Sequence, residues 1–235
     1  MITTTPSHHL LSLHPLEPFP DPAGPASIHL DVSMLQPRLH PRAWRERIRL
    51  SDDGFCDCPV SINLSRTLAM GLVAGSSTLS HRALAELRLG TRQAWDLAAD
   101  NLVVSARSPL GTRFYLRQAM DTGLISVPAA IQVKVPGAPV TAWLAHPRTF
   151  TILNRHLEDR LGSDLTYLAP QPDLLIVLPA DDGADPEPSA KELSDTVSGP
   201  GRSAGELIST VALNYRLGFP APRVADIRVP QPQVA

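Results

Sequence analysis

The residues best suited to chemistry lie in one short run, Trp143-Leu144-Ala145-His146-Pro147-Arg148. Proline suits the first turn of a helix, so we expect this run to join the end of a strand to the start of a helix. The amides and the positive end of that helix would attract an anion, with Arg148 as a second donor and Trp143 as a stacking surface. His146 could move a proton there. Trp143, His146 and Arg148 are therefore the candidate ligand-binding residues.

A structural interpretation of the same run is also open. In this interpretation Trp143 belongs to the core, His146 caps the helix and Arg148 is solvated. Neither interpretation supplies a nucleophile, so no residue is predicted to be catalytic.

The two cysteines of the chain lie together in Cys56-Asp57-Cys58. A tetrahedral zinc site needs four ligands, and the nearest histidines, His40 and His81, lack the spacing of a paired ligand motif. We expect the two thiols to face the same side of a strand. The acidic residues after position 180 lack the ligand spacing of a calcium loop. The sequence therefore predicts no metal site.

One basic cluster stands out, around a run that alternates like a strand from Trp44 to Leu50. Recognition of single-stranded nucleic acid needs aromatic stacking as well as charge, and Trp44 is the one aromatic residue here. Glu46 interrupts the cluster, and the whole chain has a net charge of -2. We therefore expect a solvated strand face and no nucleic-acid partner. The cluster consists of Arg38, His40, Arg42, Arg45, Arg47 and Arg49.

The common signatures of catalysis and cofactor binding are absent from the sequence. It has no Gly-x-Ser-x-Gly elbow, no glycine-rich phosphate loop with a following lysine, and no His-Glu-x-x-His pair. These absences lead us to predict no cofactor.

The composition is that of a globular protein with an unusual share of proline. Apolar residues make up 43% of the chain and charged residues 19%, but there are 24 prolines among 235 residues. The start of the sequence lacks the basic and apolar regions of a signal peptide, and no apolar run reaches the roughly 18 residues of a membrane span. We therefore expect a cytoplasmic protein without a membrane partner. Lys134 and Lys191 are the only lysines, and this preference for arginine suggests a high-GC genome, such as that of an actinobacterium.

Changes in composition along the sequence divide the chain into three parts. Residues 1–27 are proline-rich and poor in branched apolar residues, which predicts a disordered tail. Residues 28–229 are expected to form a single domain, and residues 230–235 a second tail. Within the domain, residues 181–192 are acidic and aperiodic, so we expect a mobile loop there.

Hydrophobic periodicity and turn residues predict the elements of this domain. The fold class that follows is α+β, a mostly antiparallel sheet with helices packed on it. Helices are expected at 64–73, 81–87, 91–106, 147–161 and 204–217. Strands are expected at 28–32, 44–50, 55–64, 113–120, 124–127, 131–135, 140–145, 165–168, 174–178 and 224–229.

Two stretches carry a resemblance to a known family. Thr91 to Leu102 contains an Asn-Leu pair after helically spaced alanines, and the second stretch runs from Trp143 to Phe150. Together with the order of elements over residues 80–180, they resemble the YtpQ-like bacterial proteins, and the composition resembles corynebacterial members of that kind. The resemblance implies an architecture only, because no activity can be carried over from that family to this chain.

Two functions are compatible with these observations. The absence of catalytic signatures in a well-patterned chain favours a non-enzymatic binding or protein-interaction protein, with a protein partner or a second copy of the chain as its ligand. The alternative is an enzyme or binder that acts on a small anionic metabolite at the Trp143–Arg148 junction.

Overall fold

A computed structural model describes residues 31–47, 58–162, 164–179, 185–199 and 207–223. The predicted tails, 1–27 and 230–235, and the predicted strand at 224–229 lie outside the described residues. In the described part the chain forms four α-helices, several short 3-10 helices and three antiparallel sheets.

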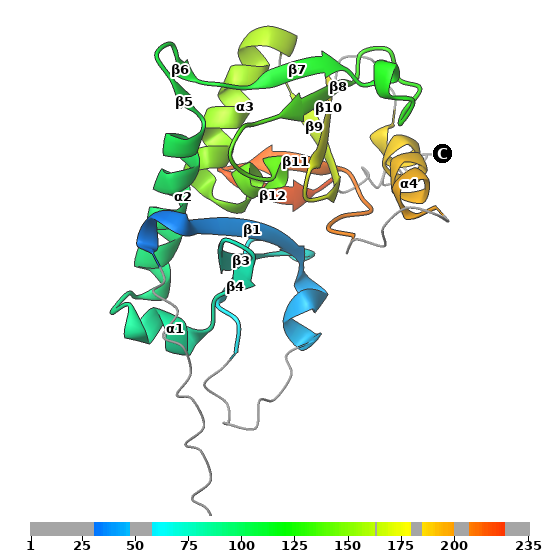
Figure 1. Cartoon of the computed structure of the whole chain (residues 1–235). Coiled ribbons are helices and arrows are strands. Elements are labelled where there is room, and N and C mark those ends of the chain that lie inside the picture. Colours follow the sequence, from blue (N-terminus) through cyan, green and yellow to red (C-terminus); the bar gives the residue numbers. More distant parts are fainter. Residues whose placement is uncertain (1–30, 48–57, 163, 180–184, 200–206, 224–235) are drawn as a thin grey trace, which may run out of the picture.

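Two antiparallel sheets form the framework (Figure 1). The smaller has the strand order β1-β3-β2, with β4 paired to β3, and the larger has the order β12-β11-β9-β10-β8-β7. The strands of the smaller sheet are β1 (Leu35–Pro41), β2 (Ser61–Asn63), β3 (Leu68–Ala74) and β4 (Ser77–Thr78). Those of the larger sheet are β7 (Tyr115–Gln118), β8 (Ile131–Lys134), β9 (Leu165–Gln171), β10 (Leu174–Pro179), β11 (Leu213–Arg216) and β12 (Phe219–Pro222). A separate hairpin pairs β5 (Arg107–Ser108) with β6 (Gly111–Thr112).

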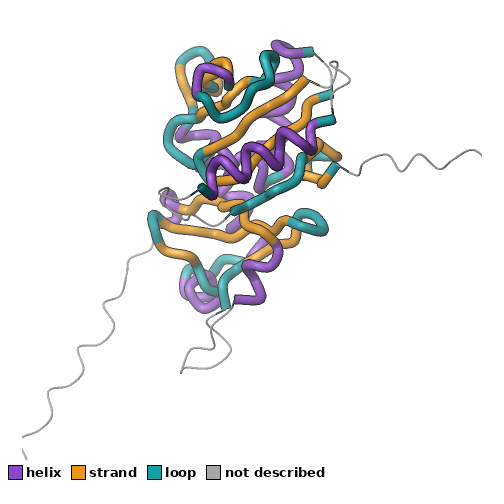
Figure 2. The backbone as a smooth tube through the Cα atoms, turned by 90° about the vertical axis from the view of Figure 1, so that its right-hand side faces the viewer, coloured by secondary structure: helices purple, strands orange, loops and turns teal. Residues whose placement is uncertain are grey.

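The helices cover the faces of these sheets. Figure 2 shows α4 lying across one face of the larger sheet, whose other face packs against α3 and a buried 3-10 helix, η5. The α-helices are α1 (His81–Glu86), α2 (Thr91–Ser105), α3 (Pro147–Leu161) and α4 (Pro186–Ser198), and the 3-10 helices include η1 (Val32–Met34), η2 (Arg42–Arg47), η4 (Met120–Thr122) and η5 (Val140–Ala145).

The predicted α+β class is confirmed, and every strand pair described is antiparallel. One buried cluster includes side chains of both main sheets, among them Leu39 of β1 and Tyr167 of β9. A second cluster lies between α4 and the opposite face of the larger sheet, where Leu193 meets residues such as Ile176. The smaller sheet therefore shares its apolar interior with one face of the larger sheet.

Helices with clear boundary residues form as predicted. The Ser80 hydroxyl accepts the Ala83 amide at 3.2 Å, so it caps α1. Helix α3 starts at Pro147 and its C-cap is Gly162, as the sequence indicates. Helix α2 begins at Thr91, the first residue of the range predicted for it, and Gly90 occupies the cap position.

Two largely apolar runs have a different structure from the one predicted. The expected helix at 64–73 is strand β3 from Leu68, and the expected strand at 140–145 is η5, whose six residues are all buried. Strand β3 is buried up to its last residue and η5 is buried throughout, so their hydrophobicity has no period that distinguishes a helix from a strand. Their tertiary neighbours decide: β3 lies between β1 and β2, whereas η5 fills the space beside β1.

Two predictions near the C-terminus are also wrong. The expected loop at 181–192 is helix α4 from Pro186, capped by the Asp185 carboxylate, which accepts the Glu187 amide at 3.2 Å. The expected helix at 204–217 contains β11, because a tight turn after Arg216 makes a hairpin of residues whose spacing also fits a helix. Residues 180–184 and 200–206 lie outside the described residues.

Two further predicted strands are not found in the described part. Residues 124–127 are an irregular segment, although Ile125 is buried against the cluster under α4. The strand predicted at 28–32 lies mostly outside the described residues, and Val32 begins η1.

The Asn-Leu pair of α2 has a structural role. The Asn101 amide donates to the carbonyl oxygens of Val32 and Leu35, both at 2.9 Å. These two bonds hold the start of β1 against α2. This accounts for an asparagine in a helix interior, where its helix propensity is modest.

The hairpin between β11 and β12 is strained at an exposed position. Leu217 and Gly218 have φ values of 50° and 87°, the left-handed pair of a type I′ turn, in which Asn-Gly is preferred. Leu217 is 86% exposed, so its side chain does not offset the cost of this conformation. A Cβ added at Gly218 would lie 2.7 Å from that of Pro147, so the turn lies directly against the start of α3.

Neighbouring substitutions in this turn should have opposite effects on stability. We expect Leu217→Asn to raise the free energy of unfolding by about 1 kcal/mol, because asparagine tolerates the left-handed region. We expect Gly218→Ala to lower it by about 2 kcal/mol or more, because backbone strain and a clash with Pro147 combine. Urea denaturation measures both, and a stabilised Gly218→Ala would contradict the close approach.

Candidate functional site

The predicted ligand-binding junction is built from the end of η5 and the start of α3. His146 caps α3: its Nδ1 accepts the Arg148 amide at 3.1 Å, and its Nε2 lies 3.0 Å from an Asp96 carboxylate oxygen on α2. Because Nδ1 accepts, the proton of the neutral ring is on Nε2, which donates to Asp96. The ring also stands edge-on to Trp95, with centroids 4.6 Å apart. Both nitrogens of His146 are thus occupied by internal contacts.

Burial lowers the pKa of His146, although its hydrogen bond to Asp96 works in the opposite direction. The ring is 5% exposed, so the neutral form fits this environment. A neutral histidine with both nitrogens bonded inside the protein positions a helix and has no free lone pair to accept a proton from a ligand.

Arg148 and Trp143 are placed in different environments. Arg148 is exposed and donates to Asp100 of α2 at 2.5 Å, while Arg92 lies 3.5 Å from Asp96. Trp143 is fully buried, edge-on to Phe114, and its indole N–H has no acceptor among the described residues. The structure therefore brings His146 and Arg148 to one helix end, faces them with carboxylates, and puts Trp143 in the core. This arrangement favours the structural interpretation of the run.

This interpretation predicts that two substitutions at the junction lower the free energy of unfolding by different amounts. His146→Ala removes a cap, a buried hydrogen bond and a ring contact, so we expect it to lower the free energy of unfolding by about 1–2 kcal/mol. Arg148→Ala removes one exposed ion pair, so we expect a change below about 0.5 kcal/mol. Urea denaturation measures both changes. If the two variants lose the same unfolding free energy, Arg148 does more than pair with Asp100.

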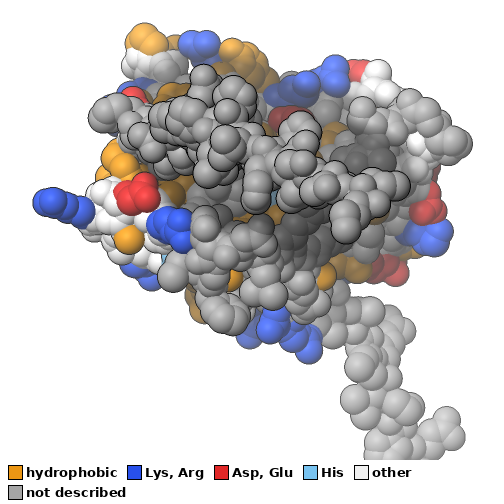
Figure 3. Space-filling model, turned by 60° about the horizontal axis from the view of Figure 1, so that its bottom comes forward, with side chains coloured by type: hydrophobic (Ala, Val, Ile, Leu, Met, Phe, Trp, Pro, Cys, Tyr) orange, Lys and Arg blue, Asp and Glu red, His pale blue; other side chains and the backbone are white. Residues whose placement is uncertain are grey.

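The basic cluster near the N-terminus does not form the predicted strand face. Residues 42–47 form η2, whereas Arg49 lies outside the described residues. Trp44 stacks on His40, with ring centroids 4.0 Å apart and planes 9° apart. The pair covers Gly71, where an added Cβ would lie 3.0 Å from Trp44. On the face shown in Figure 3, basic and acidic side chains are interspersed.

The buried His40 ring should make stability depend on pH. Desolvation, aided by the nearby charge of Arg38, lowers the pKa of His40 to about 4 from an ordinary value near 6.5. The unfolded chain therefore binds this proton first, so stability is complete above pH 6.5 and falls as the pH drops to 4, by at most about 3 kcal/mol.

We expect His40→Phe, which keeps a ring on Trp44 but cannot titrate, to remove this part of the pH dependence. Unfolding free energies of both proteins between pH 4 and 7 test this. If the two curves run parallel, His40 is not the titrating group.

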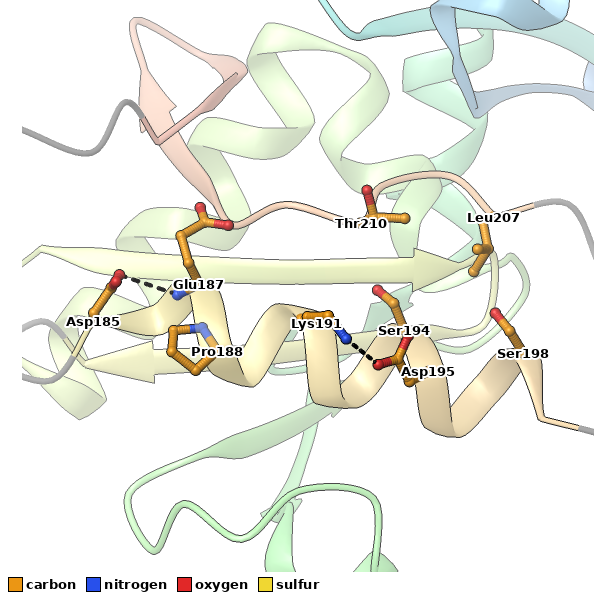
Figure 4. Close-up of a pocket in the computed structure, with 9 residues that line it drawn as sticks. All are labelled: Asp185, Glu187, Pro188, Lys191, Ser194, Asp195, Ser198, Leu207 and Thr210. Atoms are coloured by element: carbon orange, nitrogen blue, oxygen red, sulfur yellow. Dashed lines mark hydrogen bonds and ion pairs between the residues drawn. The ribbon is translucent and has the colours of Figure 1, made fainter.

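A groove of about 640 Å³ lies between α4 and the segment before β11 (Figure 4). Its charged groups already have internal partners. Glu187 accepts the Ala212 amide at 3.3 Å, Lys191 lies 2.6 Å from Asp195, and Asp185 caps the helix. The groove therefore has polar walls, but each of these charged groups is already engaged by a partner within the protein and is not free to hold a ligand. Its lining residues are Asp185, Glu187, Pro188, Lys191, Ser194, Asp195, Ser198, Leu207 and Thr210.

The two outer strands of the larger sheet differ in their exposed backbone. Just after β12, the Arg223 amide donates to the Ala212 carbonyl. In this register alternate amides of β12 point toward β11, so Pro220 and Pro222 lie at the outward-facing positions. Proline has no N–H, so this edge offers no donor at either position. The β12 edge is therefore closed to a further strand.

The opposite outer strand, β7, is open. The Ala119 amide donates to Ala130 at 2.8 Å, so the odd-numbered residues of β7 direct their backbone groups toward β8. Leu116 and Gln118 then point their N–H and C=O groups outward, and nothing in the described part of the chain bonds to them. The strand contains no proline. The other outer strands are β1, with Pro37 and Pro41, and β2, which has three residues.

The surface around β7 is cationic and partly apolar. From Arg107 to Lys134 the chain has four cationic residues and one carboxylate, Asp121, although the whole chain is net negative. Leu110 is 100% exposed, and Tyr115 and Met120 are about half exposed. We call the surface formed by Arg113, Tyr115, Arg117, Met120 and Lys134, together with the outward backbone of Leu116 and Gln118, the β7 edge surface.

This surface is not among the candidate sites that the sequence predicts, although two signals point to it. Arg113, Tyr115 and Arg117 recur at every second position, and no proline occurs between positions 110 and 127 of a proline-rich chain. That β7 would be an outer strand could not be read from these residues, because strand order depends on distant pairings.

Two negative findings concern the described residues. No group of three or more metal-ligating side chains is found there. Every helix in this part of the chain is too short or too polar to traverse a bilayer.

No protein-family model, no curated protein and no solved structure matches this chain.

Proposed function

We propose that this is a non-enzymatic, cytoplasmic binding protein that receives a protein partner at the β7 edge surface. The observation that carries the proposal is the open edge of β7, with the outward backbone groups of Leu116 and Gln118. Unpaired strand edges are templates for another chain, and peptide recognition by strand addition uses such an edge.

The surroundings of the edge support the same function. Exposed Tyr115, in β7, and Met120, two residues after that strand, supply apolar area close to the unpaired backbone. A contact surface of this kind needs apolar anchors within a polar rim. The predicted metabolite site at the Trp143–Arg148 junction has weaker support, because the polar groups of His146 and Arg148 already bond to α2.

A proline on the edge should abolish partner binding without unfolding the protein. Gln118→Pro removes an outward donor and leaves the bonds to β8 in place, which reproduces the arrangement of Pro220 in β12. Gln118→Ala is the matched control, because it removes the same side chain and keeps the donor.

Affinity capture from a native bacterial lysate, quantified against the wild-type protein, measures the effect. We expect a stoichiometric partner with the wild type and Gln118→Ala, and a loss of about tenfold or more with Gln118→Pro at an unchanged melting temperature. Equal capture by all three proteins would reject the β7 edge, and turnover of a substrate that a point change abolishes would reject a non-enzymatic role.

A further inference from the structure

The two faces of β7 differ in chemistry, and this difference specifies a partner. Leu116 pairs in register with Val133, which is fully buried in the shared core, so Leu116 faces the interior. Tyr115 and Arg117 alternate with it and therefore lie on the opposite face. Arg117 donates to Gln132 at 2.6 Å on that face, and Lys134 is the register partner of Tyr115.

The cations on this outer face form a short row. The Arg113 guanidinium donates to the Tyr115 hydroxyl at 3.2 Å, so both side chains lie together. Arg113, Arg117 and Lys134 are exposed and have no carboxylate within ion-pair distance among the described residues. Elsewhere, the exposed pairs Arg148–Asp100 and Lys191–Asp195 neutralise their own charges.

We infer that the partner segment is an extended, acidic stretch of chain that pairs with β7 as a seventh strand. This inference rests on the proposed function and adds the chemistry of the ligand. A strand added to β7 would lie about 4.8 Å away, with its side chains about 5 Å from those directly opposite. Carboxylates at every second position would meet Arg113 and Arg117 directly, with Lys134 one strand further in on β8. Apolar side chains between them would extend the core face beside Leu116.

A second copy of β7 fits this edge poorly. Pairing two such strands would bring Arg113 and Arg117 of one copy close to those of the other, and like charges facing across a ladder are destabilising. Single-stranded nucleic acid would meet the same cations but would not use the outward amides of Leu116 and Gln118, because phosphates pair with charged side chains in any register.

Synthetic ligands test the inference with the full-length protein. The probe is a fluorescein-labelled peptide of four Glu-Val repeats, followed by anisotropy, and its comparisons are the Lys-Val peptide and an oligothymidylate of equal charge. We expect the Glu-Val peptide to bind, to weaken as salt rises, and to bind at least about fivefold more tightly than either comparison.

Variants separate backbone pairing from charge. Gln118→Pro should weaken binding of the Glu-Val peptide by about tenfold and Gln118→Ala by less than about twofold, because only the first removes a donor. The double variant Arg113→Ala/Arg117→Ala should weaken it by about fivefold, whereas the exposed Arg216→Ala on β11 should leave it unchanged.

A readout on the wild-type protein covers the case in which Gln118→Pro unfolds. Hydrogen exchange at the Leu116 and Gln118 amides should slow when the Glu-Val peptide is added, and exchange in β12 should not change. Unchanged exchange at both β7 amides would overturn strand addition, even if the peptide binds elsewhere through charge.

The remaining outcomes separate this inference from the proposed function. If no acidic peptide binds but Gln118→Pro still abolishes capture of a lysate partner, the edge is the binding site and the acidic chemistry is wrong. Tighter binding of the oligothymidylate, insensitive to Gln118→Pro, would overturn the inference in favour of nucleic acid. Dimerisation in light scattering that Gln118→Pro abolishes would identify a second copy as the occupant. If neither peptide binding nor partner capture is observed, both proposals fail, and the arginines serve only to protect an edge.

Discussion

The structure depends on covering both faces of β9 and β10. These two central strands are buried along most of their length, and a strand in that position must meet apolar side chains on each side of the sheet. Helix α3 and η5 supply one side, together with residues of the smaller sheet, and α4 supplies the other. The positions of the remaining elements follow from this requirement: α2 holds the smaller sheet through Asn101, and the caps at His146 and Asp185 place the starts of the two covering helices.

The sequence predicts elements whose boundaries are local and fails where burial removes the pattern. Helix α3 is predicted to the residue because Pro147 and Gly162 mark its ends and one stripe of apolar residues lies between them. Strands β9 and β10 are found because a turn separates them. In contrast, β3 and η5 are buried almost throughout, and their contacts with β1, distant in the chain, determine which becomes a strand. The N-terminal part of α4 escapes prediction for another reason: its acidic, aperiodic composition is typical of a mobile loop, although Asp185-Pro186-Glu187 is a helix-start sequence.

Prediction of the candidate sites has the same limit. The sequence correctly identifies the start of α3 as a place where His146 and Arg148 meet, but it does not show that Asp96 and Asp100, some fifty positions earlier, face them. The alternation of cations along β7 is visible in the sequence. Its place at the margin of a sheet is not, because that margin is created by the pairing of β8 with β10, which are separated by all of α3. The sequence thus identifies which side chains could bind a ligand. It does not show which of them already have partners within the fold.

The prolines of β12 have a consequence for assembly. A sheet that accepts a strand at both margins can grow without limit, since each molecule added presents a fresh margin to the next, and this is the route to fibres. Here Pro220 and Pro222 make one margin unreactive, so the larger sheet has a single growing end. Joining through that end consumes it and leaves nothing to propagate. The stoichiometry of a complex formed by strand addition at β7 would therefore be limited by the backbone itself, because the opposite margin of the larger sheet offers no donors at Pro220 and Pro222.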